Sequence, residues 1–180
     1  MDSSTTNKTL KTLIFSAVFA ALAVALNYAL AFAPNIKLFN LIIFLAGFWG
    51  GINAGILAGF ASSLIYFIFN PFGMSPLPLL ITQVICITIV GIVGGVCKFV
   101  NCFNKKLVYI ILIATIIGAS LSILYNIAVD SITAMTSGVP ILAYVISGIA
   151  WSGINIIINT IAFAVLIPLL LPLGKRFEKL

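Results

Sequence analysis

Residues 12–33 constrain this chain strongly, because they combine the absence of charged side chains with a regular spacing of alanines. As a helix, 22 residues are long enough to cross the hydrocarbon core of a bilayer. Alanine recurs at every fourth position of this stretch: Ala17, Ala21, Ala25, Ala29 and Ala33. Side chains four residues apart share one face of a helix, so these alanines predict a smooth ridge. Small side chains let helix backbones approach closely, and the ridge therefore predicts contact with another protein helix, in this chain or in a partner.

The composition places the whole chain in the membrane. Hydrophobic residues make up 63% of it and charged residues only 7%, whereas soluble proteins carry roughly a quarter charged residues. The apolar runs are continuous and lack the alternation of a membrane barrel. We therefore expect an all-α integral membrane protein of the cell membrane. The net charge of +6 does not indicate a nucleic-acid partner, because the lysines lie at the ends of apolar runs, where they set topology.

The apolar runs predict a compact bundle of six transmembrane helices. They are expected at residues 12–33, 38–49, 52–69, 79–97, 107–129 and 142–167. The second and third come from one uncharged run, 38–69, which is about 48 Å long as a single helix. Because that is too long for one span and too short for two, we expect a break at Trp49-Gly50-Gly51 and a short second helix. Close helix contact is predicted at a second fourfold repeat of small residues: Gly47, Gly51, Gly55 and Gly59.

An even number of spans puts both chain ends on the same side of the membrane. With six helices, eight lysine and arginine residues lie on that side and only Lys37 on the other. The positive-inside rule then predicts that both termini are cytoplasmic. Turn-forming residues predict loops at 70–78 and 131–140, and Pro168 is expected to end the last helix. The expected organisation is a tail at 1–11, a membrane domain at 12–173 and a tail at 174–180.

Catalysis and metal binding find little support in these residues. The chain has no histidine and only three acidic residues, Asp2, Asp130 and Glu178. General acid–base catalysis needs positioned titratable groups, and a metal site needs clustered ligands. The three cysteines form no CxxC motif and are expected to be free thiols. We therefore expect no enzyme activity, no metal and no cofactor.

Polar side chains inside the apolar helices indicate a binding site instead. Such groups are costly in hydrocarbon, so they face the protein interior or a wet cavity. Most lie between the outer ends of the helices and their middle: Asn27, Gln83, Tyr125, Asn126, Asp130, Trp151 and Asn155, with Lys37 in the first outer turn. Asn159 continues the face of Trp151 and Asn155 into the inner half, which has fewer polar residues. This asymmetry predicts a pocket open to the outside. Asp130 is expected to cap the outer end of the fifth helix.

Each of these residues also has a simpler interpretation. Asn126, Asn155 and Asn159 would provide hydrogen bonds between helices, worth about 0.6–2 kcal/mol each. Trp151 and Tyr125 would be aromatic residues at the membrane interface. Asp130 would be a solvated helix end, and Lys37 an ordinary loop lysine.

The combination of these features resembles the substrate-binding (S) components of energy-coupling factor (ECF) vitamin transporters. The shared features are a length near 180 residues, six helices with both termini inside, a short second helix, a glycine-rich third helix, an Asn70-Pro-Phe-Gly loop and an AxxxA pattern at Ala17 and Ala21. The resemblance covers nearly the whole chain.

The resemblance implies capture of a vitamin-like substrate from outside and its release inside when the protein topples in the membrane. The chain would dock through Ala17, Ala21 and Ala25 onto a membrane scaffold subunit that is coupled to two cytoplasmic ATPase subunits. The sequence itself lacks the GxxxxGK[ST] nucleotide-binding motif. In the family, the ligand usually contacts the fourth to sixth helices and the first, third and fifth loops, which adds Asn70 to the site and leaves Asn27 outside it.

The single acid, the amides and the aromatic residues of the expected pocket favour a planar, neutral or cationic substrate. Two other functions fit the same pattern. One is a self-sufficient carrier or channel that oligomerises through the alanine ridge, and the other is a non-transporting membrane scaffold. The outward bias of the polar residues argues against both, because a channel needs a polar path through the membrane.

Overall fold

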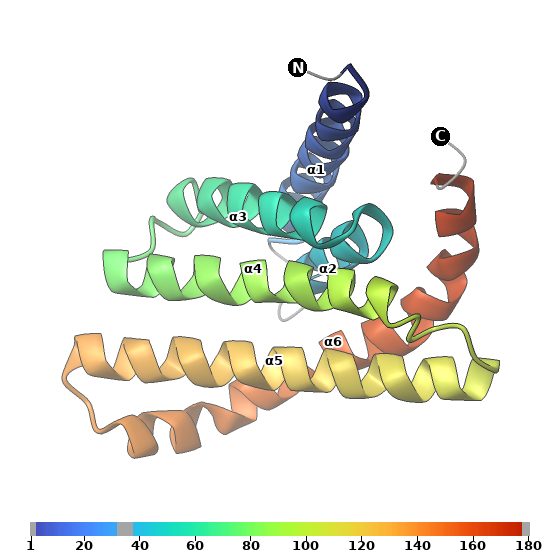
Figure 1. Ribbon diagram of the computed structural model, residues 1–180. Helices are drawn as coiled ribbons and strands as arrows, with labels where there is room; N and C mark the ends of the chain where they lie inside the picture. The colour runs from blue at the N-terminus through green and yellow to red at the C-terminus, as the bar shows by residue number, and fades with distance from the viewer. Residues whose placement is uncertain (1–2, 32–37, 178–180) are drawn as a thin grey trace.

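The computed structural model describes residues 3–31 and 38–177, with the side chains of 3–6, 149–151, 173 and 175–177 outside the description. Within these ranges the regular structure is entirely helical (Figure 1). The helices are α1 (Ser3–Ala29), α2 (Phe39–Gly50), α3 (Ile52–Ile68), α4 (Leu77–Phe99), α5 (Leu107–Ser137) and α6 (Ile141–Phe177). Stretches of α1, α4, α5 and α6 are long and apolar enough to cross a membrane, and α2 and α3 are shorter apolar helices. The chain is therefore an all-helical, multi-pass membrane protein, as its composition predicts.

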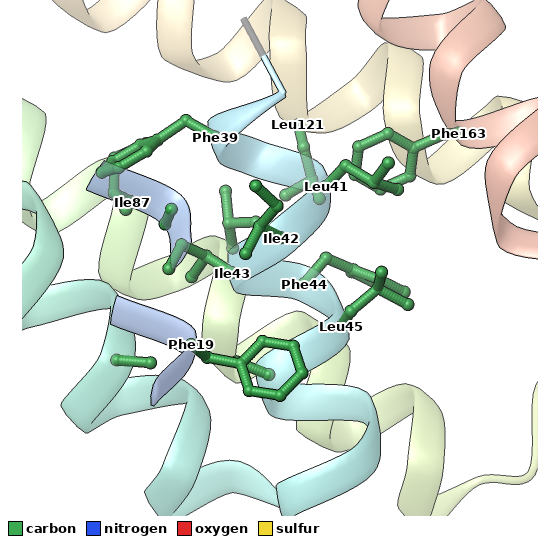
Figure 2. Close-up of a cluster of buried hydrophobic side chains, with 14 of the residues drawn as sticks. Phe19, Phe39, Leu41, Ile42, Ile43, Phe44, Leu45, Ile87, Leu121 and Phe163 are labelled. Carbon is green, nitrogen blue, oxygen red and sulfur yellow. The ribbon is translucent and has the colours of Figure 1, made fainter. Parts of the chain in front are cut away.

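The short helix α2 lies at the centre of the molecule. Every residue from Phe39 to Gly47 is buried, although α2 has only 12 residues. Figure 2 shows its side chains packed against those of the surrounding helices. Phe44, for example, meets Phe163 of α6 edge to face, with ring centroids 5.4 Å apart. A helix that is apolar all round has to be covered all round, and here the neighbouring helices cover it.

The predicted break between the second and third helices is confirmed. α2 ends at Gly50, α3 begins at Ile52, and Gly51 between them adopts a φ of +90°. That backbone conformation costs glycine little, because glycine has no Cβ. Gly51 therefore belongs to the turn rather than to a helix contact, in contrast to its place in the predicted repeat.

Three other glycines bring the backbones of α2, α3 and α4 into direct contact. A Cβ placed on Gly47 or Gly55 would overlap the carbonyl oxygen of Gly91, and one on Gly91 would overlap the carbonyl of Gly55. At Gly59 the approach is less tight, 3.0 Å from the carbonyl oxygen of Ile87. The predicted close contact is thus confirmed at Gly47, Gly55 and Gly59. At these glycines the helices pack backbone against backbone, without side chains between them.

The fifth helix extends further than the sequence predicts. A polar loop is expected over 131–140, but α5 continues to Ser137. Its polar side chains do not break it, because hydroxyls such as that of Thr133 bond to a carbonyl one turn earlier. The helix ends instead at Gly138, which forms a left-handed cap with a φ of +69°. Asp130 consequently lies about two turns inside α5 and does not cap its end.

The first and last helices are also longer than expected. Pro168 was expected to end the last helix, but α6 continues to Phe177 with Pro168 and Pro172 inside it. A proline removes one helix hydrogen bond and bends the chain without necessarily ending the helix. In Figure 1 the final part of α6 turns away from α5. At the other end, α1 begins at Ser3, so the part of the 1–11 tail that the structure describes is helical.

The backbone contact at Gly91 leads to a stability prediction. In Gly91→Ala, the new Cβ collides with the carbonyl group of Gly55, and neither backbone can move without separating α3 from α4. We expect the free energy of unfolding to fall by about 1–3 kcal/mol. Thermal unfolding of the purified protein in detergent measures the change.

Gly153→Ala in α6 is the matched control, since a Cβ there meets no described atom within 4 Å. Alanine is favoured over glycine in a helix by about 1 kcal/mol, so this variant should be unchanged or more stable. Equal unfolding temperatures for the two variants would show that α3 and α4 do not meet at Gly91.

Candidate functional site

A small buried cavity lies where the helices converge. Its lining comes from each helix of the structure: Asn27 of α1, Phe39 and Asn40 of α2, Tyr66 and Phe67 of α3, Ile87 of α4, Tyr125 of α5, and Asn155 and Asn159 of α6. The cavity measures about 30 Å³, which is room for about one or two water molecules. In an otherwise apolar core, six of these nine side chains carry an amide or a hydroxyl group.

Two asparagines of α6 bond to each other at the cavity, and one of them, Asn159, is the most buried polar residue of its lining. Asn159 is 2% exposed, and its Nδ2 donates to the backbone oxygen and to Oδ1 of Asn155, at 3.0 and 2.9 Å. Its own Oδ1 is buried and accepts no hydrogen bond from any described residue. A buried oxygen without a partner costs roughly 1–3 kcal/mol, so this atom is set to receive a donor from water or from a ligand.

Asn27 repeats this arrangement on α1. It is buried, and its Nδ2 donates to the backbone oxygen of Ala23, one turn earlier, at 3.0 Å. The side-chain hydrogen bonds of Asn126, Asn155 and Asn159 also lie within their own helices. The interpretation of Asn126, Asn155 and Asn159 as hydrogen bonds between helices therefore finds no support in the described contacts.

Aromatic rings from three helices gather at the same place. The ring of Tyr66 lies 5.5 Å from those of Tyr28 and Phe39 and 5.2 Å from that of Phe67, measured between centroids. Figure 2 shows Phe39 at the start of α2, close to Ile87. The Tyr28 hydroxyl donates to the backbone oxygen of Phe69 at 2.9 Å and so ties the end of α1 to the end of α3. These rings give the cavity a partly aromatic wall.

A second group of polar side chains lies next to the cavity, between α4 and α5. Gln83 of α4 is buried, and Tyr125 of α5 lines the cavity. Gln83 Oε1 and the hydroxyl of Ser122 are buried and have no partner among the described residues. These atoms add to the unsatisfied hydrogen-bonding capacity around Tyr125.

The other residues of the predicted site lie elsewhere. Asp130 is partly buried between α5 and α6, where its Oδ2 accepts a hydrogen bond from Ser152 at 3.2 Å. Asn126 donates to the backbone oxygen of Ser122 at 2.8 Å and does not line the cavity. Asn70 accepts a bond from the backbone N–H of Phe72 at 2.9 Å, as in a turn that asparagine commonly stabilises.

Two predicted residues lie outside what the structure describes, namely Lys37 and the side chain of Trp151. The structure also adds residues that the sequence did not single out, above all Asn40 and Tyr66. Asn40 carries a signal, because it is a lone amide within the apolar segment 38–48. Tyr66 carries none, since aromatic residues are common throughout these helices.

The alanine ridge of α1 faces away from the rest of the chain. Ala17, Ala21, Ala25 and Ala29 are all exposed, whereas Ser16, Ala20, Ala23 and Asn27, which point the other way, are buried. Packing of these four alanines within the chain, one of the two interpretations of the ridge, is therefore wrong. Ala33 lies outside the described residues.

An open apolar groove runs beside this ridge. It is lined by Val18 and Leu22 of α1, Leu41 and Leu45 of α2 and Leu166 and Leu170 of α6, among other residues. In Figure 1, α1 and the final part of α6 stand apart, with α2 between them. The outer face of α1 and the groove together form a continuous surface of small and apolar side chains.

Comparison with known proteins gives no relative for this chain. No protein-family model matches it. No curated protein and no solved structure matches it significantly. Its function has to be argued from its own residues.

The bonding of Asn159 leads to a second prediction. If this amide serves a ligand rather than the fold, Asn159→Leu should leave the unfolding temperature of the ligand-free protein unchanged or raise it. Leucine has a similar size. It removes a buried oxygen that has no partner, and this gain offsets the donor that Asn155 Oδ1 loses. Thermal unfolding in detergent tests this.

Phe163→Ala, one turn further along α6, is the reference variant. Phe163 is fully buried against Phe44, and its truncation should cost about 3–5 kcal/mol. A loss of similar size in Asn159→Leu would show that the amide holds the fold together.

Proposed function

We propose that this chain is the substrate-capture subunit of a membrane importer, of the kind that the S components of ECF transporters represent. Its six helices form a transmembrane bundle with both termini in the cytoplasm. The subunit takes a small planar molecule, neutral or cationic, from outside the cell and carries it inward. It contributes no chemistry of its own, and the energy comes from partner subunits.

One observation carries this proposal: polar side chains from five helices converge on a single buried cavity. Asn27, Asn40, Tyr66, Tyr125 and Asn159 come from five separate segments of an otherwise apolar chain. Polar groups within a membrane protein are costly to bury and most often serve a ligand or a transported species. A hydrogen bond between two helices needs only two polar side chains, whereas here five side chains from distant parts of the sequence converge.

The cavity is smaller than a typical binding site for a small molecule. Pockets for small molecules measure roughly 300–1,000 Å³, at least ten times the 30 Å³ found here. Binding of a vitamin-sized molecule requires the lining helices to move apart, and the ligand then supplies partners for the unpaired oxygen of Asn159.

The surface of α1 supports the second half of the proposal, docking onto a membrane partner. The exposed alanines at 17, 21 and 25 offer a partner helix close backbone approach. Within the bilayer such contact is driven by packing, because lipid is as apolar as the protein surface. In the proposed complex the partner is a scaffold subunit joined to two cytoplasmic ATPase subunits.

The same exposed ridge also fits a second candidate, a self-sufficient carrier that oligomerises through α1. In that case, the partner helix is α1 of another copy. The two candidates differ in their energy source. Uptake into liposomes that contain only this chain would favour the carrier, and uptake that requires ATPase subunits favours the importer.

Ligand binding is the first consequence to test. The purified protein should be stabilised by one or a few members of a panel of water-soluble vitamins and their precursors, because a ligand that binds only the folded state raises the unfolding temperature. Asn155→Leu should abolish the shift, whereas Asn126→Leu, outside the cavity, should keep it. No shift with any compound would remove the support for a capture subunit.

Docking is the second consequence. Ala21→Trp places a large side chain on the exposed face of α1, whereas the cavity residue Asn27 of the same helix is buried. It should reduce uptake of the identified ligand in the native host at least about tenfold, since close helix packing is lost. Binding to the purified variant should be unchanged. Ile116→Trp, on an exposed position of α5, is the control. Equal uptake by both variants would contradict docking through α1.

A further inference from the structure

The cavity lining divides into an aromatic part and an amide part. Phe39, Tyr66 and Phe67 form the aromatic part, with centroid distances of 5.2 to 6.2 Å among them. The rings are tilted or nearly perpendicular to one another, so they offer both faces and edges that a planar ring contacts by stacking or edge to face. This part of the lining selects a ligand by its planar shape and contributes little to selecting its hydrogen-bonding groups.

At the two most buried amides of the lining, Asn159 and Asn27, the side-chain N–H groups already donate hydrogen bonds. Asn159 uses its Nδ2 on Asn155, and Asn27 uses its Nδ2 on the backbone of its own helix. Asn159 Oδ1 is left buried and unpartnered among the described residues. An amide oxygen accepts hydrogen bonds and never donates them. A ligand that satisfies this atom has to carry an N–H or O–H donor.

The lining also discriminates by charge. None of the described residues around the cavity is charged. The acid on the same helix as Tyr125, Asp130, lies outside the lining and accepts a hydrogen bond from Ser152. A charged ligand buried in an apolar bundle without a counter-charge loses its hydration and gains no ion pair. A neutral ligand is therefore favoured over a cationic one.

From these three features we infer that the cavity selects an uncharged, planar nitrogen heterocycle with an N–H donor directed at Asn159 Oδ1. This inference rests on the proposed function and narrows its substrate class. Loss of the N–H donor leaves the buried oxygen unpaired in the complex, so the site rejects an N-methylated analogue more strongly than its size alone requires.

The test uses matched probes and the full-length purified protein in detergent. Uracil is paired with 1,3-dimethyluracil, which lacks both N–H groups, and nicotinamide with the 1-methylnicotinamide cation, which adds a charge to the same ring. The vitamin panel is sorted into neutral N–H heterocycles, cations and anions. Stabilisation is expected only from neutral N–H compounds, with at least about tenfold weaker binding after N-methylation.

Asn159→Leu supplies the internal control. It removes the acceptor, so an N–H compound and its N-methylated partner should bind this variant with equal affinity. Asn126→Leu, an identical change outside the cavity, should keep the tenfold difference. A purely structural role for Asn159 would weaken both compounds alike and leave their ratio unchanged, which would overturn the inference.

The remaining outcomes separate this inference from the proposed function. Stabilisation by cations or anions, or equal stabilisation by N-methylated compounds, overturns the inference and leaves substrate capture standing. No stabilisation by the probes or by any member of the vitamin panel overturns both, and then water is the occupant of the cavity.

Discussion

The direct backbone contact among α2, α3 and α4 is the interaction on which the rest of the structure depends. Gly47, Gly55 and Gly91 leave no room for a Cβ, so the three helices meet without intervening side chains. This contact holds α2, which is too short to span a bilayer, at the centre of the molecule. The start of α2 then delivers Phe39 and Asn40 to the cavity. Tight packing at one end of α2 thus positions the polar site at the other.

The polar site is unusual because the surrounding side chains leave part of its hydrogen-bonding capacity unsatisfied. A buried amide in an apolar bundle is stable when its hydrogen bonds are satisfied, and Asn159 leaves one oxygen unsatisfied. A hydrogen bond from another helix would satisfy this oxygen, yet the side-chain hydrogen bonds of Asn27 and Asn159 remain within their own helices. The unpaired oxygen destabilises the fold, and a bound molecule that donates a hydrogen bond to it removes that cost. This arrangement is expected of a binding site.

Much of the fold is predictable from the sequence, because in a membrane the length and continuity of apolar runs determine where helices form. The break at Gly51 and the bounds of α2 and α3 follow from a run too long for one span. The errors lie where residues that commonly end a helix are tolerated inside one. The Thr133 hydroxyl bonds to a backbone carbonyl within α5, and Pro168 lies inside α6 without ending it. Within the site, Asn27, Tyr125, Asn155 and Asn159 were predictable as polar groups in apolar helices. Tyr66 was not, since only tertiary packing distinguishes it from other aromatic residues.

The central claim is that the cavity holds a small molecule, and native mass spectrometry tests it most directly. The protein is purified without added ligand from cells grown in rich medium, alongside an Asn155→Leu, Asn159→Leu double variant. The account predicts a mass excess on the unmodified chain that corresponds to one small uncharged molecule and is absent from the variant. Identical masses for the two, each equal to that of its bare chain, under conditions that preserve the fold, would contradict it.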